Sequence, residues 1–254
     1  MGSVLLFWIS LILIIYIYVG YAVLLLFISH FKKQQKIADL PEENLPEVTL
    51  FVAAWNERDF VKDKVQNSLE LDYPEEKLTL LWVTDGSDDG TPELLSQYPR
   101  IKVLHDPRRN GKIGAMNRGM QFVNTPIVVF CDANTYLNKD AIKQIVASFA
   151  DSKVGCVAGE KRIFSSEKDN ASGSGEGFYW KIESFIKKTE SKIGSTVGAA
   201  GELFAIRTSL FEPVEQDTIL DDFVISMRIA LKGYTVIYNP QAIATETSSA
   251  SVKD

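Results

Sequence analysis

An unbroken apolar run at residues 127–131 ends directly at Asp132, and this junction limits the possible folds more than any other part of the chain. Such a run is typical of a strand buried on both faces of a sheet. Asn134 follows two positions later, and side chains at i and i+2 of an extended segment point to the same side. Asp132 and Asn134 therefore direct two oxygen ligands at one point, which suits Mg²⁺ or Mn²⁺. The alternative is an ordinary Asx turn after a strand.

The same order of apolar strand and polar turn recurs through the first half of the chain. Apolar runs occupy residues 48–54, 78–83 and 101–104, and helical spacing occupies residues 57–71, 92–98, 111–123 and 138–149. This alternation predicts an α/β domain with a mostly parallel central sheet and helices on both faces. Ligands bind beyond the carboxyl ends of the strands in such sheets. Three polar clusters are expected to meet at that edge, at residues 54–57, 85–91 and 132–135.

The second half of the chain is less regular. We expect strands at residues 154–158, within 196–206 and at 235–238, helices at 178–193 and 221–231, and a polar, glycine-rich loop at 165–177. Asp221 and Asp222 stand in the first turn of the last helix, and Gly233 is placed to end it.

The start of the chain predicts a membrane segment. Residues 4–29 carry no charge and, as one helix, extend about 39 Å, more than a hydrocarbon core of about 30 Å. We therefore expect a single transmembrane helix within residues 1–31 and a linker at 32–46; a buried helix of a soluble protein is the alternative. Lys32, Lys33 and Lys36 follow the span, so the rest of the chain is expected on the cytosolic side of the cell (inner) membrane.

Composition excludes some classes of protein. The net charge of −6 argues against a nucleic-acid binder that works by phosphate neutralisation. The two cysteines, Cys131 and Cys156, lie in apolar runs, which favours buried thiols and a cytosolic setting. No Gly-x-Gly-x-x-Gly follows the first strand, so an NAD-dependent oxidoreductase is disfavoured.

Several motifs stand in a fixed order along the chain. They are Ala53-Ala54-Trp55-Asn56-Glu57, Asp85-Gly86-Ser87-Asp88-Asp89-Gly90-Thr91, Gly111-Lys112-Ile113-Gly114-Ala115-Met116-Asn117, Asp132-Ala133-Asn134, Gly198-Ala199-Ala200-Gly201 and Leu220-Asp221-Asp222. In this order they resemble family 2 glycosyltransferases of the GT-A nucleotide-diphospho-sugar transferase fold, over about residues 47–246. The resemblance is greatest to the membrane-bound branch of chitin, hyaluronan and poly-N-acetylglucosamine synthases.

The resemblance implies an enzyme that moves a sugar, with inversion, from a nucleotide sugar to an acceptor hydroxyl. The donor is usually a UDP-sugar, and the acceptor is a glycan or a lipid-linked molecule. By position, the nucleotide is bound by Ala54, Asn56, Glu57, Asp85, Ser87, Asp88, Lys112 and Asp132. Asp132 and Asn134 would hold Mg²⁺ or Mn²⁺, because a diphosphate leaving group needs positive charge beside it.

The remaining matches concern the transfer step. Asp222 matches the family's general base and Asp221 the acid before it, although both can also serve as caps of a helix. Gly201, Glu202 and Arg228 match the sugar and acceptor pocket, but Arg228 is equally suited to a structural ion pair. Simpler alternatives exist for Lys112, as a solvated lysine, and for residues 85–91, as a plain turn.

The sequence departs from the family pattern at three places. Asn134 stands where a second Asp is common, so the metal site loses one charge, and Glu202 stands where a small apolar residue is common. The Gln-x-x-Arg-Trp motif of processive members is not reached, so residues 247–254 are expected to begin a longer tail. These departures leave open a second hypothesis, a catalytically weak nucleotide-sugar-binding or scaffold protein.

Overall fold

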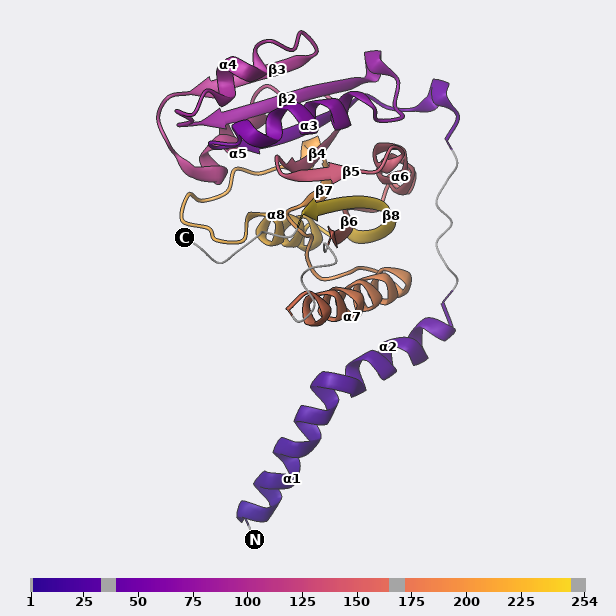
Figure 1. The fold of residues 1–254 in the computed structure, drawn as a ribbon. Helices are drawn as coiled ribbons and strands as arrows, with labels where there is room; N and C mark the ends of the chain where they lie inside the picture. The colour runs from indigo at the N-terminus through magenta and orange to yellow at the C-terminus, as the bar shows by residue number, and fades with distance from the viewer. Residues whose placement is uncertain (1, 33–39, 165–171, 248–254) are drawn as a thin grey trace.

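A computed structural model describes residues 2–32, 40–164 and 172–247, which form one α/β domain preceded by a helical segment (Figure 1). Within these residues one sheet has the strand order β3-β2-β1-β4-β7-β6-β8-β5. The strands are β1 (Val48–Ala54), β2 (Leu78–Asp85), β3 (Ile101–Asp106), β4 (Ile127–Asp132), β5 (Thr135–Leu137), β6 (Val154–Phe164), β7 (Leu203–Arg207) and β8 (Thr235–Thr247). The helices are α3 (Arg58–Leu69), α4 (Thr91–Leu95), α5 (Gly111–Met120), α6 (Ala141–Ser148), α7 (Ser172–Ile193) and α8 (Asp221–Leu231).

The sheet is mixed rather than mostly parallel. Strands β3, β2, β1 and β4 pair in parallel as expected, but β7 joins β4 and β6 antiparallel, and β5 joins β8 antiparallel. The sheet also curls. Only Ala133 and Asn134 connect β4 to β5, although β5 lies at the far end of the strand order, so that end must fold back toward β4.

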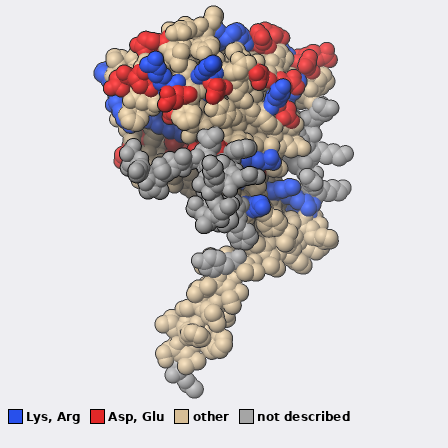
Figure 2. Space-filling model, viewed as in Figure 1, with Lys and Arg blue, Asp and Glu red and all other residues tan. Residues whose placement is uncertain are grey.

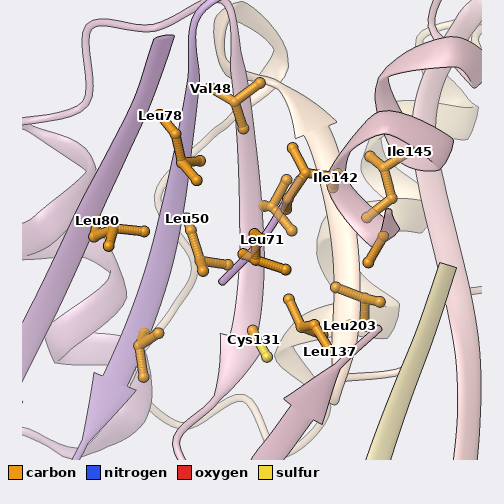
Figure 3. Packing of buried hydrophobic residues seen from close by; sticks show 14 of the residues in the cluster. Val48, Leu50, Leu71, Leu78, Leu80, Cys131, Leu137, Ile142, Ile145 and Leu203 are labelled. Atoms are coloured by element: carbon orange, nitrogen blue, oxygen red, sulfur yellow. The ribbon is translucent and has the colours of Figure 1, made fainter. Parts of the chain in front are cut away.

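Both faces of the sheet are buried, as the sequence predicts. Figure 3 shows part of the core on one face, which includes Leu50 of β1, Leu80 of β2, and Ile142 and Ile145 of α6. The other face holds a second core built from β1, β2, β4, α5 and α8. Its members include Phe51, Val83, Phe130, Met116 and Ile229. Alternate residues of one strand thus enter opposite cores, so helices are required on both faces.

Local predictions succeed better than the longer-range ones. Strand β1 and helix α8 have the predicted bounds, whereas β8 continues nine residues beyond the predicted end at Tyr238, to Thr247. The three-residue strand β5 is not predicted. The predicted loop at 165–177 is wrong from Ser172 onward, where α7 begins, and its residues 165–171 lie outside the described residues.

The helical segment at the start of the chain has three parts: α1 (Gly2–Ile15), a π-helix (Tyr16–Gly20) and α2 (Tyr21–His30). Most of its large apolar side chains are exposed, and α2 packs against α7. Across the described part of the chain, no single helix has the length and apolar character needed to cross a membrane. Of the predicted linker, residues 33–39 lie outside the described residues, and residues 42–44 form a short 3₁₀ helix.

Candidate active site

The polar loops after β1 and β2 are joined by hydrogen bonds. The Asn56 amide donates to Asp88 Oδ1 over 2.9 Å and accepts from the Asp88 backbone N–H over 3.0 Å. The Asn56 backbone N–H donates to Ser87 Oγ over 3.1 Å. Asn56 has φ 53°, a left-handed conformation that Asn tolerates better than most residues. Ala54 is buried at the end of β1. The structure therefore joins three of the predicted nucleotide-binding residues, and Ala54 precedes Asn56 by two positions.

Asp85 lies deeper, with 3% of its surface exposed. Its Oδ2 accepts the backbone N–H of Asn110 over 2.7 Å, and its Oδ1 accepts from Arg118 over 3.2 Å. Next to it Gly86 has φ 67°, and a Cβ there would lie 2.6 Å from Arg109 Cβ, so only glycine fits. Asp85 thus connects the end of β2 to the loop that precedes α5.

That loop carries a contact between Arg109 and Trp55 that is not predicted from the sequence. The Arg109 guanidinium lies 3.2 Å from the centre of the Trp55 ring, and Trp55 is 45% exposed. Such cation–π stacking holds a flat, half-exposed surface in place. The feature of the sequence that could have indicated this contact is Trp55, an aromatic residue inside the polar cluster at residues 54–57.

Lys112, in the first turn of α5, reaches across to β4. Its Nζ donates to Asp132 Oδ1 over 2.8 Å. Burial opposes the charged form of Lys112, but Asp132, Asp221 and Asp222 together raise its pKa. The Lys112 side chain is 44% exposed, yet it pairs with Asp132 and also lies within the electrostatic influence of Asp221 and Asp222.

A buried lysine supports the turn that carries Asp132. Lys64 of α3 is fully buried, and its Nζ donates to the Thr135 carbonyl over 2.5 Å and to Cys131 Sγ over 3.0 Å. Lys64 is not among the residues predicted from the sequence, although it stands three residues after Val61 on the apolar stripe of α3. Glu57 also senses this turn, because its pKa is raised by burial and by the charges of Asp132 and Asp89.

The acidic pair begins α8, as predicted. Asp221 is 8% exposed, and within the described residues its Oδ2 has no hydrogen-bond partner. Asp222 is half-buried. Its pKa is raised by burial and by the negative charges of Asp221 and Glu202, although the Phe223 backbone N–H and Lys112 oppose the shift. A Cβ on Gly201 would lie 3.5 Å from Asp222 Oδ2 and 3.7 Å from Lys112 Nζ, so Gly201 keeps this space open.

The two other predicted pocket residues are engaged elsewhere. Glu202 forms an ion pair with Lys161 of β6. Arg228 pairs with Glu215 and donates to the Pro213 carbonyl over 2.9 Å, which matches the structural alternative raised from the sequence. Lys112 links Asp132 to the acidic pair near Gly201, whereas Arg228 stabilises the loop before α8.

The oxygen ligands around Asp132 suit a divalent cation only in part. Among the residues that the structure describes, no three His, Cys, Asp or Glu side chains gather closely enough to hold a metal ion. Asp132 and Asn134 supply one carboxylate and one amide oxygen. Mg²⁺ and Mn²⁺ accept such a sparse set when phosphate and water complete the coordination. The donor set therefore fits a metal that arrives with a diphosphate.

Comparison with known proteins agrees with this arrangement. The sequence pattern of glycosyl transferase family 2 matches residues 49–214. Poly-beta-1,6-N-acetyl-D-glucosamine synthase from Staphylococcus aureus (strain MSSA476) is 29% identical over 216 residues, which are 82% of this chain and 52% of the relative. The synthase of that name from Staphylococcus epidermidis is 27% identical over 77% of this chain and 48% of its own. The chain thus spans about half the length of the curated relatives it matches.

Solved structures show the same fold. A mannosyltransferase from Pyrobaculum calidifontis, in complex with GDP-Man and Mn²⁺, matches with a TM-score of 0.76 and 26% identity, over 92% of this chain and 67% of its own. GalNAc-T7 with UDP, GalNAc and Mn²⁺ matches with a TM-score of 0.62 and 18% identity, over 81% of this chain and 44% of its own, which supports the fold alone.

The fold and the family match together define the class of protein. The mixed, curled sheet with its polar edge is that of a GT-A-like sugar transferase. The chain belongs to glycosyl transferase family 2.

Proposed function

We propose that this chain transfers a hexose from a UDP-sugar to a hydroxyl of a glycan or lipid-linked acceptor, with inversion and with Mg²⁺ or Mn²⁺. The observation that carries the proposal is the position of Lys112, 2.8 Å from Asp132 and electrostatically coupled to Asp221 and Asp222. The Lys112 ammonium can thus stabilise the leaving diphosphate and also lie beside the acidic pair proposed to react with the acceptor hydroxyl. The relatives' name, poly-beta-1,6-N-acetyl-D-glucosamine synthase, makes UDP-N-acetylglucosamine the first donor to test.

The nucleotide is assigned to the loops after β1 and β2. Asn56, Ser87 and Asp88 hold each other in place, which supports a rigid rim for the base and ribose. Asp85 is also proposed to support nucleotide binding, by holding the loop at Asn110 through the backbone N–H of that residue. A bound divalent cation would supply positive charge to the diphosphate, with Asp132 and Asn134 as its protein ligands.

Asp222 is proposed as the general base. It takes the proton of the acceptor hydroxyl while the acceptor oxygen bonds to the anomeric carbon, and the bond from that carbon to the diphosphate breaks with its electron pair on UDP. Its half-buried position and raised pKa support this role. Asp221, which is more deeply buried, is proposed to position the start of α8 and to balance Lys112.

A membrane position is also proposed. The large apolar side chains of α1 and the π-helix are exposed, and Figure 2 shows this segment almost without Lys, Arg, Asp or Glu. A surface of this kind suits lipid rather than water. Lys32 follows the segment, which supports the cytosolic side for the catalytic domain.

The experiment combines binding and transfer on the same protein. UDP affinity is measured by calorimetry with and without Mn²⁺, and hydrolysis and transfer of UDP-N-acetylglucosamine are measured alongside. Asp222→Asn should retain UDP affinity and lose about 10²–10⁴ in rate. Binding without any turnover in the unaltered chain would support the second hypothesis, a nucleotide-sugar-binding protein. Near-normal transfer by Asp222→Asn would remove this residue from the role of base.

A further inference from the structure

Asn134 and Glu202, the two site residues that depart from the family pattern, are joined by a series of polar contacts. The Asn134 amide nitrogen donates to Glu246 Oε1 over 3.0 Å. Glu246 Oε2 lies 3.0 Å from Lys161 Nζ, and Lys161 also pairs with Glu202. Asn134 and Glu202, which both depart from the family pattern, are therefore connected through Lys161 and Glu246.

The curl of the sheet makes this contact possible. Glu246 lies on β8 opposite Thr135 of β5 and beside Ile163 of β6. Thr135 directly follows Asn134, so the pairing of β8 with β5 brings Glu246 beside the metal-binding turn. Lys161 is only 14% exposed at its side chain and lies 4.8 Å from the centre of the Trp180 ring, which limits the freedom of Glu246.

A carboxylate can only accept hydrogen bonds, whereas an amide has a donating end and an accepting end. Glu246 therefore selects the amide nitrogen of Asn134 as its neighbour, and the amide oxygen is turned away from Glu246. Among the described residues, the Asn134 side chain makes one hydrogen bond, and this bond is to Glu246. The oxygen stays available for a cation.

The same geometry accounts for asparagine at position 134. An aspartate in its place would face the Glu246 carboxylate at hydrogen-bond distance. Two carboxylates this close cannot both ionise without a large cost. A neutral amide avoids the repulsion and adds a hydrogen bond to a charged group. The hydrogen bond to Glu246 thus gives a structural reason for asparagine at this position.

We propose that Glu246 is a positioning residue that orients the Asn134 amide oxygen toward the metal–diphosphate site, and that Lys161 and Glu202 hold Glu246 in place. The role in metal binding rests on the proposed function, because it requires that a metal–diphosphate complex binds beside Asp132. The orientation of the amide does not depend on that function.

The binding test uses UDP and Mn²⁺ with the full chain. Glu246→Gln should weaken Mn²⁺-dependent UDP binding by about tenfold and leave metal-free UDP binding unchanged, because glutamine no longer enforces one amide orientation. Asn134→Asp should also weaken it, although it restores the commoner residue. The double variant, in which the new glutamine can donate to the new carboxylate, should regain most of the affinity. Glu212→Gln removes a lysine-paired carboxylate outside this network and is the control.

Independent effects of the two substitutions, or tighter binding by Asn134→Asp in the unaltered background, would overturn the proposal. A second measurement needs no nucleotide. The side-chain amide signals of Asn134 in a ¹⁵N spectrum, identified by their loss in Asn134→Asp, should shift in Glu246→Gln and stay unchanged in Glu212→Gln. Unmoved signals would overturn the orientation. Shifted signals in a protein that does not bind UDP would leave the orientation standing and refute the proposed function.

Discussion

The Lys112 ammonium lies 2.8 Å from the Asp132 carboxylate and joins the start of α5 to the end of β4. This pair places a positive charge at the carboxyl edge of the sheet, beside the carboxylate of Asp132. A metal ion bound by Asp132 would compete with Lys112 for that carboxylate, and a diphosphate would offer Lys112 new acceptors. Exchange of partners at one carboxylate thus provides a physical link between donor binding and the position of Lys112.

Lys112→Met should therefore weaken UDP binding by about tenfold to a hundredfold, because it removes a hydrogen bond between charged groups. The methionine keeps most of the volume of the lysine stem. Lys62→Met is the matched control, because Lys62 is exposed on α3. Calorimetry with UDP and Mn²⁺ measures both variants. Equal affinity in Lys112→Met and Lys62→Met would show that Lys112 does not contact the diphosphate.

The pH dependence of transfer should report Asp222. Burial raises its pKa, and a general base works only as the carboxylate, so transfer should fall with decreasing pH sooner than for an ordinary aspartate of pKa about 3.9. Lys112 lowers this pKa, so Lys112→Met should move the acid limb of kcat/KM to higher pH. Circular dichroism at each pH separates titration from unfolding. An acid limb that Lys112→Met leaves in place would contradict the assignment.

Helix starts and strand ends in this site can be predicted from neighbouring residues. Contacts that depend on the pairing of distant strands cannot. The position of Asp221 and Asp222 at a helix start is predicted from neighbouring residues, and their role in the site comes from the family resemblance. Glu246 is not predicted, because it lies beyond Tyr238, the predicted end of the last strand, and Pro240 in between lacks a backbone N–H for strand pairing. The structure accommodates this proline at an irregularity in the pairing of β8 with β6, between Gly159 and Glu160. Strand β5, with three residues, is too short to show a period.

Lys64 provides a test of how the turn that carries Asp132 is supported. Lys64→Met keeps a side chain of similar length in the core but leaves the Thr135 carbonyl without this donor. We expect a loss of about 1–3 kcal/mol in the free energy of unfolding, measured with urea. Mn²⁺-dependent UDP binding should weaken as well, because the turn carries Asp132. The exposed Lys62→Met should change stability by less than about 0.5 kcal/mol. Unchanged UDP binding in a destabilised Lys64→Met would limit Lys64 to the fold.

The N-terminal helical segment offers a separate test of the membrane proposal. Ile12 lies in α1 and is exposed, so Ile12→Asp should not disturb the domain. A carboxylate near the centre of a bilayer costs about 2.5–3.5 kcal/mol, which should reduce flotation of the protein with lipid vesicles. Leu231→Asp, at an exposed position on α8, is the control and should float normally. Equal flotation of the two variants would refute lipid contact at α1.

Gly201 tests whether the space between Lys112 and Asp222 is used for the reaction. An alanine Cβ would lie 3.5 Å from Asp222 Oδ2 and 3.7 Å from Lys112 Nζ, which are ordinary contact distances, so Gly201→Ala should fold with nearly unchanged stability. The added methyl group would nevertheless occupy the room that the acceptor oxygen and the anomeric carbon need when they meet beside the base. A displacement of about 1 Å can cost about a hundredfold in rate. We therefore expect kcat to fall by about that factor while UDP affinity with Mn²⁺ is retained, since the nucleotide is assigned to other loops.

Thermal unfolding measures the stability of the Gly201→Ala fold, calorimetry measures the donor site, and initial rates measure the transfer. Normal transfer by a well-folded Gly201→Ala would place the acceptor elsewhere, and parallel loss of UDP affinity would assign Gly201 to the donor instead.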